Sequence, residues 1–139
     1  MNGSIKAILI LVVLGLPMLI FGLNELYQAN EFVRNGAYAD GVIVEMKKGS
    51  GILSKYHPRV RFQTADGETI EFIPGNGSNP AMYETHEHVP VVYNPDHPRH
   101  AAINSFIEIW LGPSIYAGLG LIFLISSGFQ WRRYRSQSK

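Results

Sequence analysis

Two long apolar stretches lie near the ends of the chain, and a more polar region with strand-like patterning lies between them. Residues 5–23 carry a single charge, Lys6, and at about 1.5 Å per residue they match the roughly 30 Å hydrocarbon core of a bilayer. Residues 106–129 form the second stretch, and Trp110 and Trp131 bracket it at about the thickness of a bilayer. Because Trp favours both membrane interfaces, the pattern predicts two transmembrane helices.

The first apolar stretch is expected to be an uncleaved anchor. A cleaved signal peptide, the alternative, needs small residues in an A-x-A-like site, whereas residues 24–27 read NELY. Asn35-Gly36 is a typical helix stop. We therefore expect a helix over residues 5–35 whose last part continues beyond the bilayer as an amphipathic stalk.

The second helix is expected over residues 105–131. Ser105, with Glu108 three residues later, fits a capping box at its start. Ser114 and Gly118 form a small-xxx-small pair on this helix, and such residues let helix backbones approach closely. Since Gly15 and Gly22 are available on the first helix as well, we expect a helical hairpin, with a homo-oligomeric interface as an equal use of the same residues.

From Asp40 the hydrophobic period changes to two, which is typical of strands. The predicted strands cover residues 41–46, 57–64, 68–73 and 88–93, with a short fifth at 101–103. Alternating apolar and polar positions favour an antiparallel sheet with one buried face. The predicted fold is thus a membrane α+β protein, in which two transmembrane helices flank a small antiparallel sheet or OB-like barrel over residues 36–104.

The basic residues beside the helices predict the orientation. Those on the side of the two termini are Lys6, Arg132, Arg133, Arg135 and Lys139, against Arg34 and Arg99 on the other side. The positive-inside rule then puts both termini in the cytoplasm, with residues 132–139 as a basic tail, and residues 24–105 outside the cytoplasm.

Metal binding is the one chemical role that the residues suggest. The chain has no cysteine, which excludes disulfides and thiolate sites, and all five histidines lie in the central region. In an extended chain, His86-Glu87-His88 places two imidazoles on one side, a spacing that can bind a divalent metal. His97 and His100 add ligands only if the fold brings them near. The alternative is a set of exposed, solvated histidines around loops.

Other activities find no support in the pattern. No serine lies in a nucleophile-elbow context, so we expect no enzyme, and we expect no cofactor. Acidic residues outnumber basic ones between residues 24 and 105, which disfavours nucleic-acid binding.

The order of short motifs resembles a bacterial membrane family, the domain of unknown function 3592. The matching stretches are GVIV at 41–44, YHPRVRF at 56–62, DGE at 66–68, VPVVYNP at 89–95, AINSF at 102–106 and WLGP at 110–113. The chain departs from the family before Val89, where a Gly-Asp pair is usual and this chain has His86-Glu87-His88. The resemblance implies two helices around a β-domain in a bacterial inner (cell) membrane, and it brings no catalytic residues.

These observations favour a non-enzymatic interaction module that presents its β-domain outside the cytoplasm. Its expected partners are the lipid bilayer and a membrane or periplasmic protein, or a second copy of itself. Two alternatives remain: an immunity protein against a toxin that acts from the periplasm, and a metal-binding membrane protein that uses His86 and His88.

Overall fold

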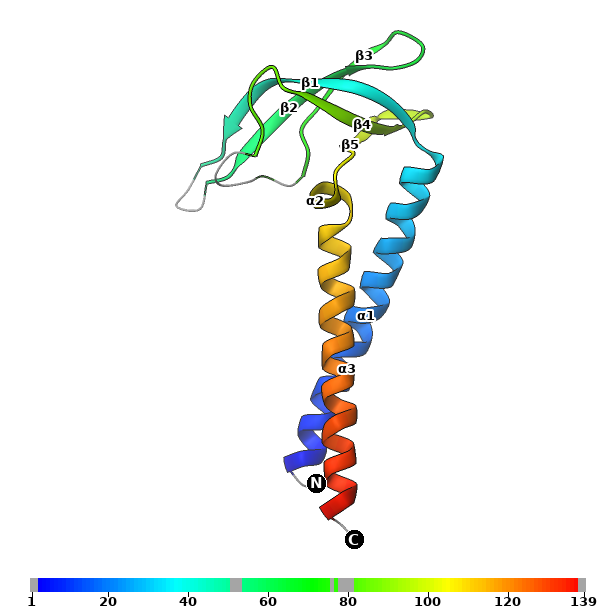
Figure 1. Ribbon diagram of the computed structural model, residues 1–139, viewed down its shortest axis with the longest axis vertical. Helices are drawn as coiled ribbons and strands as arrows, with labels where there is room; N and C mark the ends of the chain where they lie inside the picture. Colours follow the sequence, from blue (N-terminus) through cyan, green and yellow to red (C-terminus); the bar gives the residue numbers. More distant parts are fainter. Residues whose placement is uncertain (1–2, 51–53, 76, 78–81, 138–139) are drawn as a thin grey trace. The chain divides into compact units, whose positions relative to one another are not determined.

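The computed structural model describes residues 3–50, 54–75, 77 and 82–137. Its elements follow in the order α1, β1 to β5, α2 and α3 (Figure 1). They divide into two compact units. One comprises Met1–Gln28 with Leu111–Lys139, and the other comprises Ala29–Trp110.

The helical unit contains most of α1 (Gly3–Asn35) and all of α3 (Leu111–Gln137). Both helices are long and apolar enough to cross a membrane, as the sequence predicts. α1 ends at the Asn35-Gly36 stop, where Gly36 begins the turn into the sheet. α3 continues through the basic segment to Gln137, so this part of the expected tail is helical, and residues 138–139 lie outside the described part.

The two helices approach each other at glycines. Gly22 of α1 lies against the backbone of Ala117 in α3, and Gly120 of α3 lies against the backbone of Leu19 in α1. Gly15 meets α3 in the same way, and all three positions lack room for a Cβ atom. Small residues at a helix contact allow close packing of the backbones, so the helices form the expected hairpin.

The small pair on α3 is not part of this contact. A Cβ atom added at Gly118 would meet nothing within 4 Å, and Ser114 is half-buried. The structure therefore selects Gly15, Gly22 and Gly120 for the hairpin and leaves Gly118 outside it. The sequence could not make this choice, because it depends on which faces of the two helices meet.

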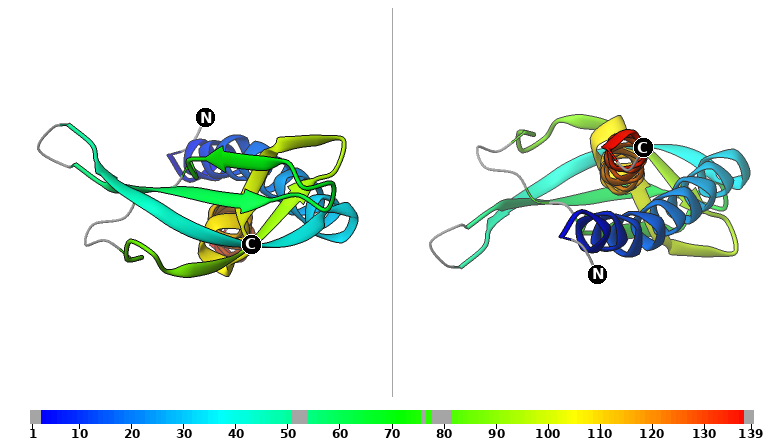
Figure 2. Two further views of the ribbon diagram at one scale, coloured as in Figure 1. Left: turned by 90° about the horizontal axis from the view of Figure 1, so that it is seen from above. Right: turned by 90° about the horizontal axis from the view of Figure 1, so that it is seen from below.

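The second unit is built on a five-stranded antiparallel sheet that twists and curls (Figures 1 and 2). Its strands are β1 (Ala37–Lys48), β2 (Tyr56–Gln63), β3 (Thr69–Phe72), β4 (His88–Asn94) and β5 (His97–Ile103). The order across the sheet is β3-β2-β1-β4-β5, and the edge strands β3 and β5 approach each other. The result is a half-closed barrel, which confirms the predicted fold class.

The fifth strand is longer than the sequence predicts. It starts at His97 rather than at Ala101, because Asn94 pairs with His97 across a two-residue turn. The side chain of Asn94 accepts a hydrogen bond of 2.9 Å from the Asp96 N–H, which stabilises the turn locally.

The core lies on one face of the curled sheet. Its buried members are Ile43, Val60, Phe62, Ile70, Val89, Val91, Tyr93 and Ile103. Along β2 they alternate with exposed or half-buried residues, as one-sided burial requires, whereas on β4 the intervening Val92 is buried as well. Tyr93 also accepts a hydrogen bond of 3.1 Å from the Ala65 N–H, which satisfies its hydroxyl group at the edge of the core.

A β-bulge in β1 allows both Ile43 and Met46 to face the core. Ile43 pairs with Val60 and Glu45 pairs with Arg59, so Val44 is an extra residue without a partner on β2. Strict alternation would place Glu45 on the face of Ile43. Because of the bulge, Glu45 points away from the core instead. The next residue, Met46, is partly buried and packs against the core.

The helix expected over residues 105–131 is divided at Trp110. Ser105 caps α2 (Phe106–Ile109) by accepting a hydrogen bond from the Glu108 N–H, as the capping pattern predicts. α3 then begins separately at Leu111. Pro113 explains the break, because it has no N–H to donate to the carbonyl of Ile109 and is tolerated only in the first turn of a helix.

Candidate functional site

The outer face of the sheet, opposite the core, carries a groove across β1, β2 and β3. Its volume is about 660 Å³. Lining residues with polar side chains are Asp40, Arg61, Gln63, Thr69 and His86, and Val42 and Val44 contribute apolar side chains. Phe62 also borders the groove, but its side chain belongs to the core on the other face. Apolar surface combined with convergent polar groups is typical of a binding site.

Cross-strand pairing explains why these residues meet. Val42 pairs with Arg61, and Gln63 pairs with Thr69. Side chains directly opposite one another in neighbouring strands point to the same face, so the outward positions of three strands form one continuous surface. The bulge adds Val44 to this surface beside Val42.

An ion-pair ladder borders the groove on the β2–β3 side. Nε of Arg61 donates a hydrogen bond of 2.7 Å to a carboxylate oxygen of Glu71. A terminal guanidinium nitrogen of Arg61 lies 2.6 Å from the same oxygen. Arg59 lies between Glu71 and Glu45, at 3.8 and 3.4 Å. Exposed pairs of this kind contribute about 0–1 kcal/mol each, so their main effect is to hold the arginines in fixed positions.

A second pair, Asp40 and His88, joins β1 to β4 on the same face. Nδ1 of His88 lies 2.7 Å from a carboxylate oxygen of Asp40. A carboxylate only accepts, so the imidazole donates this hydrogen bond. Both side chains are largely exposed, at 67% for His88 and 70% for Asp40. The pair holds an imidazole and a carboxylate next to each other beside the groove.

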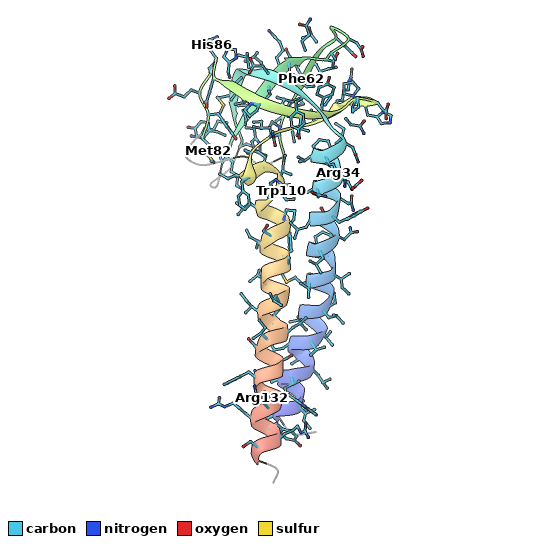
Figure 3. The ribbon with its side chains drawn as sticks, turned by 45° about the vertical axis from the view of Figure 1, so that its right-hand side comes forward. Arg34, Phe62, Met82, His86, Trp110 and Arg132 are labelled. Atoms are coloured by element: carbon cyan, nitrogen blue, oxygen red, sulfur yellow. The ribbon has the colours of Figure 1, made fainter. Side chains whose placement is uncertain are left out.

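His86 has an unusual backbone conformation. Its φ is 71°, and it is the only non-glycine residue with a positive φ in the described part of the chain. It lies in a turn that the Glu87 N–H closes by donating to the Glu84 carbonyl at 3.1 Å. Figure 3 places it at the end of the sheet opposite Arg34, with its side chain directed outward. The conformation suits the glycine that the family resemblance implies in this stretch.

The premise of the two-histidine metal hypothesis is therefore wrong in one respect. The chain is not extended at His86, so His86 and His88 do not project from one side of a strand. His86 lines the groove, while His88 contacts Asp40. Within the described ranges, no group of three or more histidine and acidic residues is placed to hold a metal ion. A role for His86 and His88 as ligands stays a prediction.

The additional histidines lie elsewhere. His97 and His100 are on β5, and His97 pairs with Asn94, about 20 Å along β4 from His88. The ring of His100 packs against Phe32 at a centroid distance of 5.0 Å. The structure thus does not bring these two histidines to the groove.

The sequence reasoning missed Asp40, Arg61, Gln63 and Thr69 as members of a site. Each occupies an outward position of a strand, where a polar residue is normally read as solvated surface. The strand order, which sets β1 between β2 and β4, is what groups them.

Comparison with known proteins gives one match. The family described as Domain of unknown function (DUF3592) matches residues 39–108, which include all eight residues that line the groove. No curated protein and no solved structure matches the chain.

Proposed function

Because the chain belongs to the DUF3592 family, which is defined without an activity, we propose its role from the geometry: a membrane-anchored, non-enzymatic interaction module that presents its β-domain outside the cytoplasm. The observation that carries this proposal is the groove on the outer face of the sheet. It combines an apolar floor with fixed polar side chains, as protein-binding surfaces do.

The surface of the helices supports membrane insertion. Only 11% of the residues in the most apolar window of each helix are buried within the protein. Large side chains such as Val13, Ile20 and Ile125 are more than half exposed. A surface so apolar is stable in lipid, where a helix satisfies its own backbone hydrogen bonds.

The basic residues support the orientation. Arg132, Arg133 and Arg135 end α3, and Lys6 lies near the start of α1. Such residues favour the cytoplasmic side, which supports cytoplasmic chain termini and a β-domain on the other side of the membrane. The resemblance to a bacterial family supports our proposal of a bacterial inner membrane as the location.

The titratable side chains of the groove support binding rather than catalysis. Arg61 is paired with Glu71, and Asp40 is paired with His88. Among the described residues, no hydroxyl group is hydrogen-bonded to His88, a contact that the activation of a serine or threonine nucleophile uses.

Site-specific photo-crosslinking in native membranes tests the proposal. A photo-reactive amino acid replaces Thr69 in the groove or, as a matched control, the exposed Arg99 on β5. We expect one dominant, stoichiometric adduct from position 69 and none from position 99, with the partner identified by mass spectrometry. An adduct with a second copy would identify self-association. Adducts with random membrane neighbours from both positions would reject the interaction role.

A further inference from the structure

We propose that the groove on β1–β3 binds a segment of a partner polypeptide that carries a carboxylate beside an aliphatic side chain. This inference rests on the proposed function and specifies the partner's chemistry. It follows from the balance of hydrogen-bond donors, charge and apolar surface among the residues that line the groove.

Several donors in the groove remain available to a ligand. Arg61 uses two of its nitrogens on Glu71, and its guanidinium carries five N–H groups in all. Gln63 donates to the Gly67 carbonyl at 3.1 Å and retains a second amide hydrogen. Thr69 adds a hydroxyl group at the same wall of the groove.

His86 adds a donor from the opposite wall. Within the part of the chain that the structure describes, its imidazole has no hydrogen-bond or ion-pair partner, although it lines the groove. Its positive φ costs about 1–2 kcal/mol for a residue with a Cβ atom. Strained residues of this kind concentrate at binding sites, where the gain in function offsets the loss in stability.

The carboxylates near the groove already have hydrogen-bond or ion-pair partners. Asp40 is hydrogen-bonded to His88, and Glu71 is shared by Arg61 and Arg59. The groove thus offers donors without an unpaired negative charge. This arrangement favours an anion, since charge-assisted hydrogen bonds to a carboxylate are roughly twice as strong as neutral ones.

The floor and the size of the groove favour a peptide. Val42 and Val44 are half-buried and adjacent on the outer face. They offer an aliphatic contact within hydrogen-bonding reach of the polar wall. The volume of about 660 Å³ lies within the range of sites that enclose ligands larger than a single small anion.

Peptide binding to the full chain in nanodiscs of zwitterionic lipid tests the inference. The probe is the acetylated, amidated peptide Glu-Val-Glu-Val, and the charge-free control is Gln-Val-Gln-Val. Amide chemical shifts of Val42, Val44 and Thr69 report binding. We expect saturable shifts with the acidic peptide and at least about tenfold weaker binding of the control.

Two variants connect the binding to the groove. His86→Gly removes the imidazole at a position whose φ suits glycine, so it retains the fold, and we expect binding about threefold to tenfold weaker. His97→Gly removes an imidazole on β5 and is expected to bind as the native protein does. Equal affinity for both peptides, or unchanged affinity in His86→Gly, would overturn the inference.

A small free carboxylic acid with an aliphatic chain would offer the same chemical groups to the groove as the peptide does. Isovalerate that bound as tightly as the acidic peptide would overturn the polypeptide assignment. Failure of this inference is distinguishable from failure of the proposed function. Crosslinking from position 69 with no discrimination between the peptides rejects only the carboxylate chemistry, and selective peptide binding without any crosslinked partner rejects the interaction role.

Discussion

Gly22 of α1 lies directly against the backbone of Ala117 in α3, with no room between them for a side chain. The ring of Phe21 meets the ring of Tyr116 edge to face beside this contact, at a centroid distance of 5.3 Å. A glycine that admits the backbone of a second helix is the close approach that packing inside a membrane exploits, because lipid provides no hydrophobic drive for helices to associate.

Replacing Gly22 by leucine is therefore expected to separate the two helices. Overpacking of this kind costs about 1–3 kcal/mol. The measurement is the yield of a bismaleimide crosslink between Phe21→Cys and Tyr116→Cys, in a chain that has no native cysteine. The matched control is Gly118→Leu, where an added Cβ meets nothing within 4 Å. Equal crosslink yields in the two variants would contradict the hairpin contact.

The turn at His86 predicts a difference between two substitutions. His86→Gly is expected to be about 1 kcal/mol more stable than His86→Ala, since alanine at φ 71° is strained and glycine is not. Amide hydrogen exchange at Ile43 measures the difference, because its N–H is bonded to the Glu87 carbonyl in the same turn. Slower exchange in the alanine variant would show that the turn does not hold a positive φ.

The bulge in β1 predicts that deletion of Val44 and deletion of Val42 have different effects on stability. Removing Val44 leaves Ile43 inward and Glu45 outward, so the core is retained. Removing Val42 instead turns Ile43 to the solvent face, since a slip of one residue reverses the faces of a strand. We expect a well-dispersed amide spectrum for the first variant and loss of several kcal/mol, or of the fold, for the second. Similar spectra for both would argue against the bulge.

The Asp40–His88 pair predicts a change in binding without a change in stability. His88→Gln is expected to alter the free energy of unfolding by less than about 1 kcal/mol, because both side chains are exposed. It leaves Asp40 without its partner, so the acidic peptide is expected to bind more weakly. Adding Asp40→Asn removes the repulsion and is expected to restore the affinity, measured by the same amide shifts. No recovery in the double variant would exclude a charge effect.

The orientation is testable with single cysteines. Asp66→Cys lies in the exposed turn between β2 and β3, and Ser136→Cys lies in the last turn of α3. In intact cells, a membrane-impermeant maleimide is expected to label the first position, and the second only after permeabilisation. The reverse pattern would place the β-domain in the cytoplasm.

Local signals account for much of the fold. The apolar stretches became α1 and α3, the Asn35-Gly36 stop ends α1, and Ser105 caps α2. Each depends on residues within a few positions of one another, which is why the sequence alone predicts them. Pro113 is a local signal for the break at Trp110, which the continuous helix predicted over residues 105–131 does not take into account.

The candidate site was harder to predict from the sequence, because its residues are far apart in the chain. Asp40 and His88 are separated by 48 positions, and their hydrogen bond exists only because β1 pairs with β4. The spacing of His86 and His88 predicts two imidazoles on one side of a strand, yet the turn at His86 directs its side chain away from that side. Sequence spacing predicts contacts only where the backbone keeps one regular conformation.

The hydrophobic pattern by itself determined that this protein has two long apolar helices around a strand-rich centre: unbroken apolar stretches predict the helices, and a period of two predicts the strands. It reflects burial by whole elements, so each segment reveals its own type without reference to the others. Tertiary structure alone decided the strand order, the bulge that turns Glu45 outward, and the glycines at which the helices meet. These features arise from pairing between distant segments, whose free energy depends on the partner as much as on the segment itself.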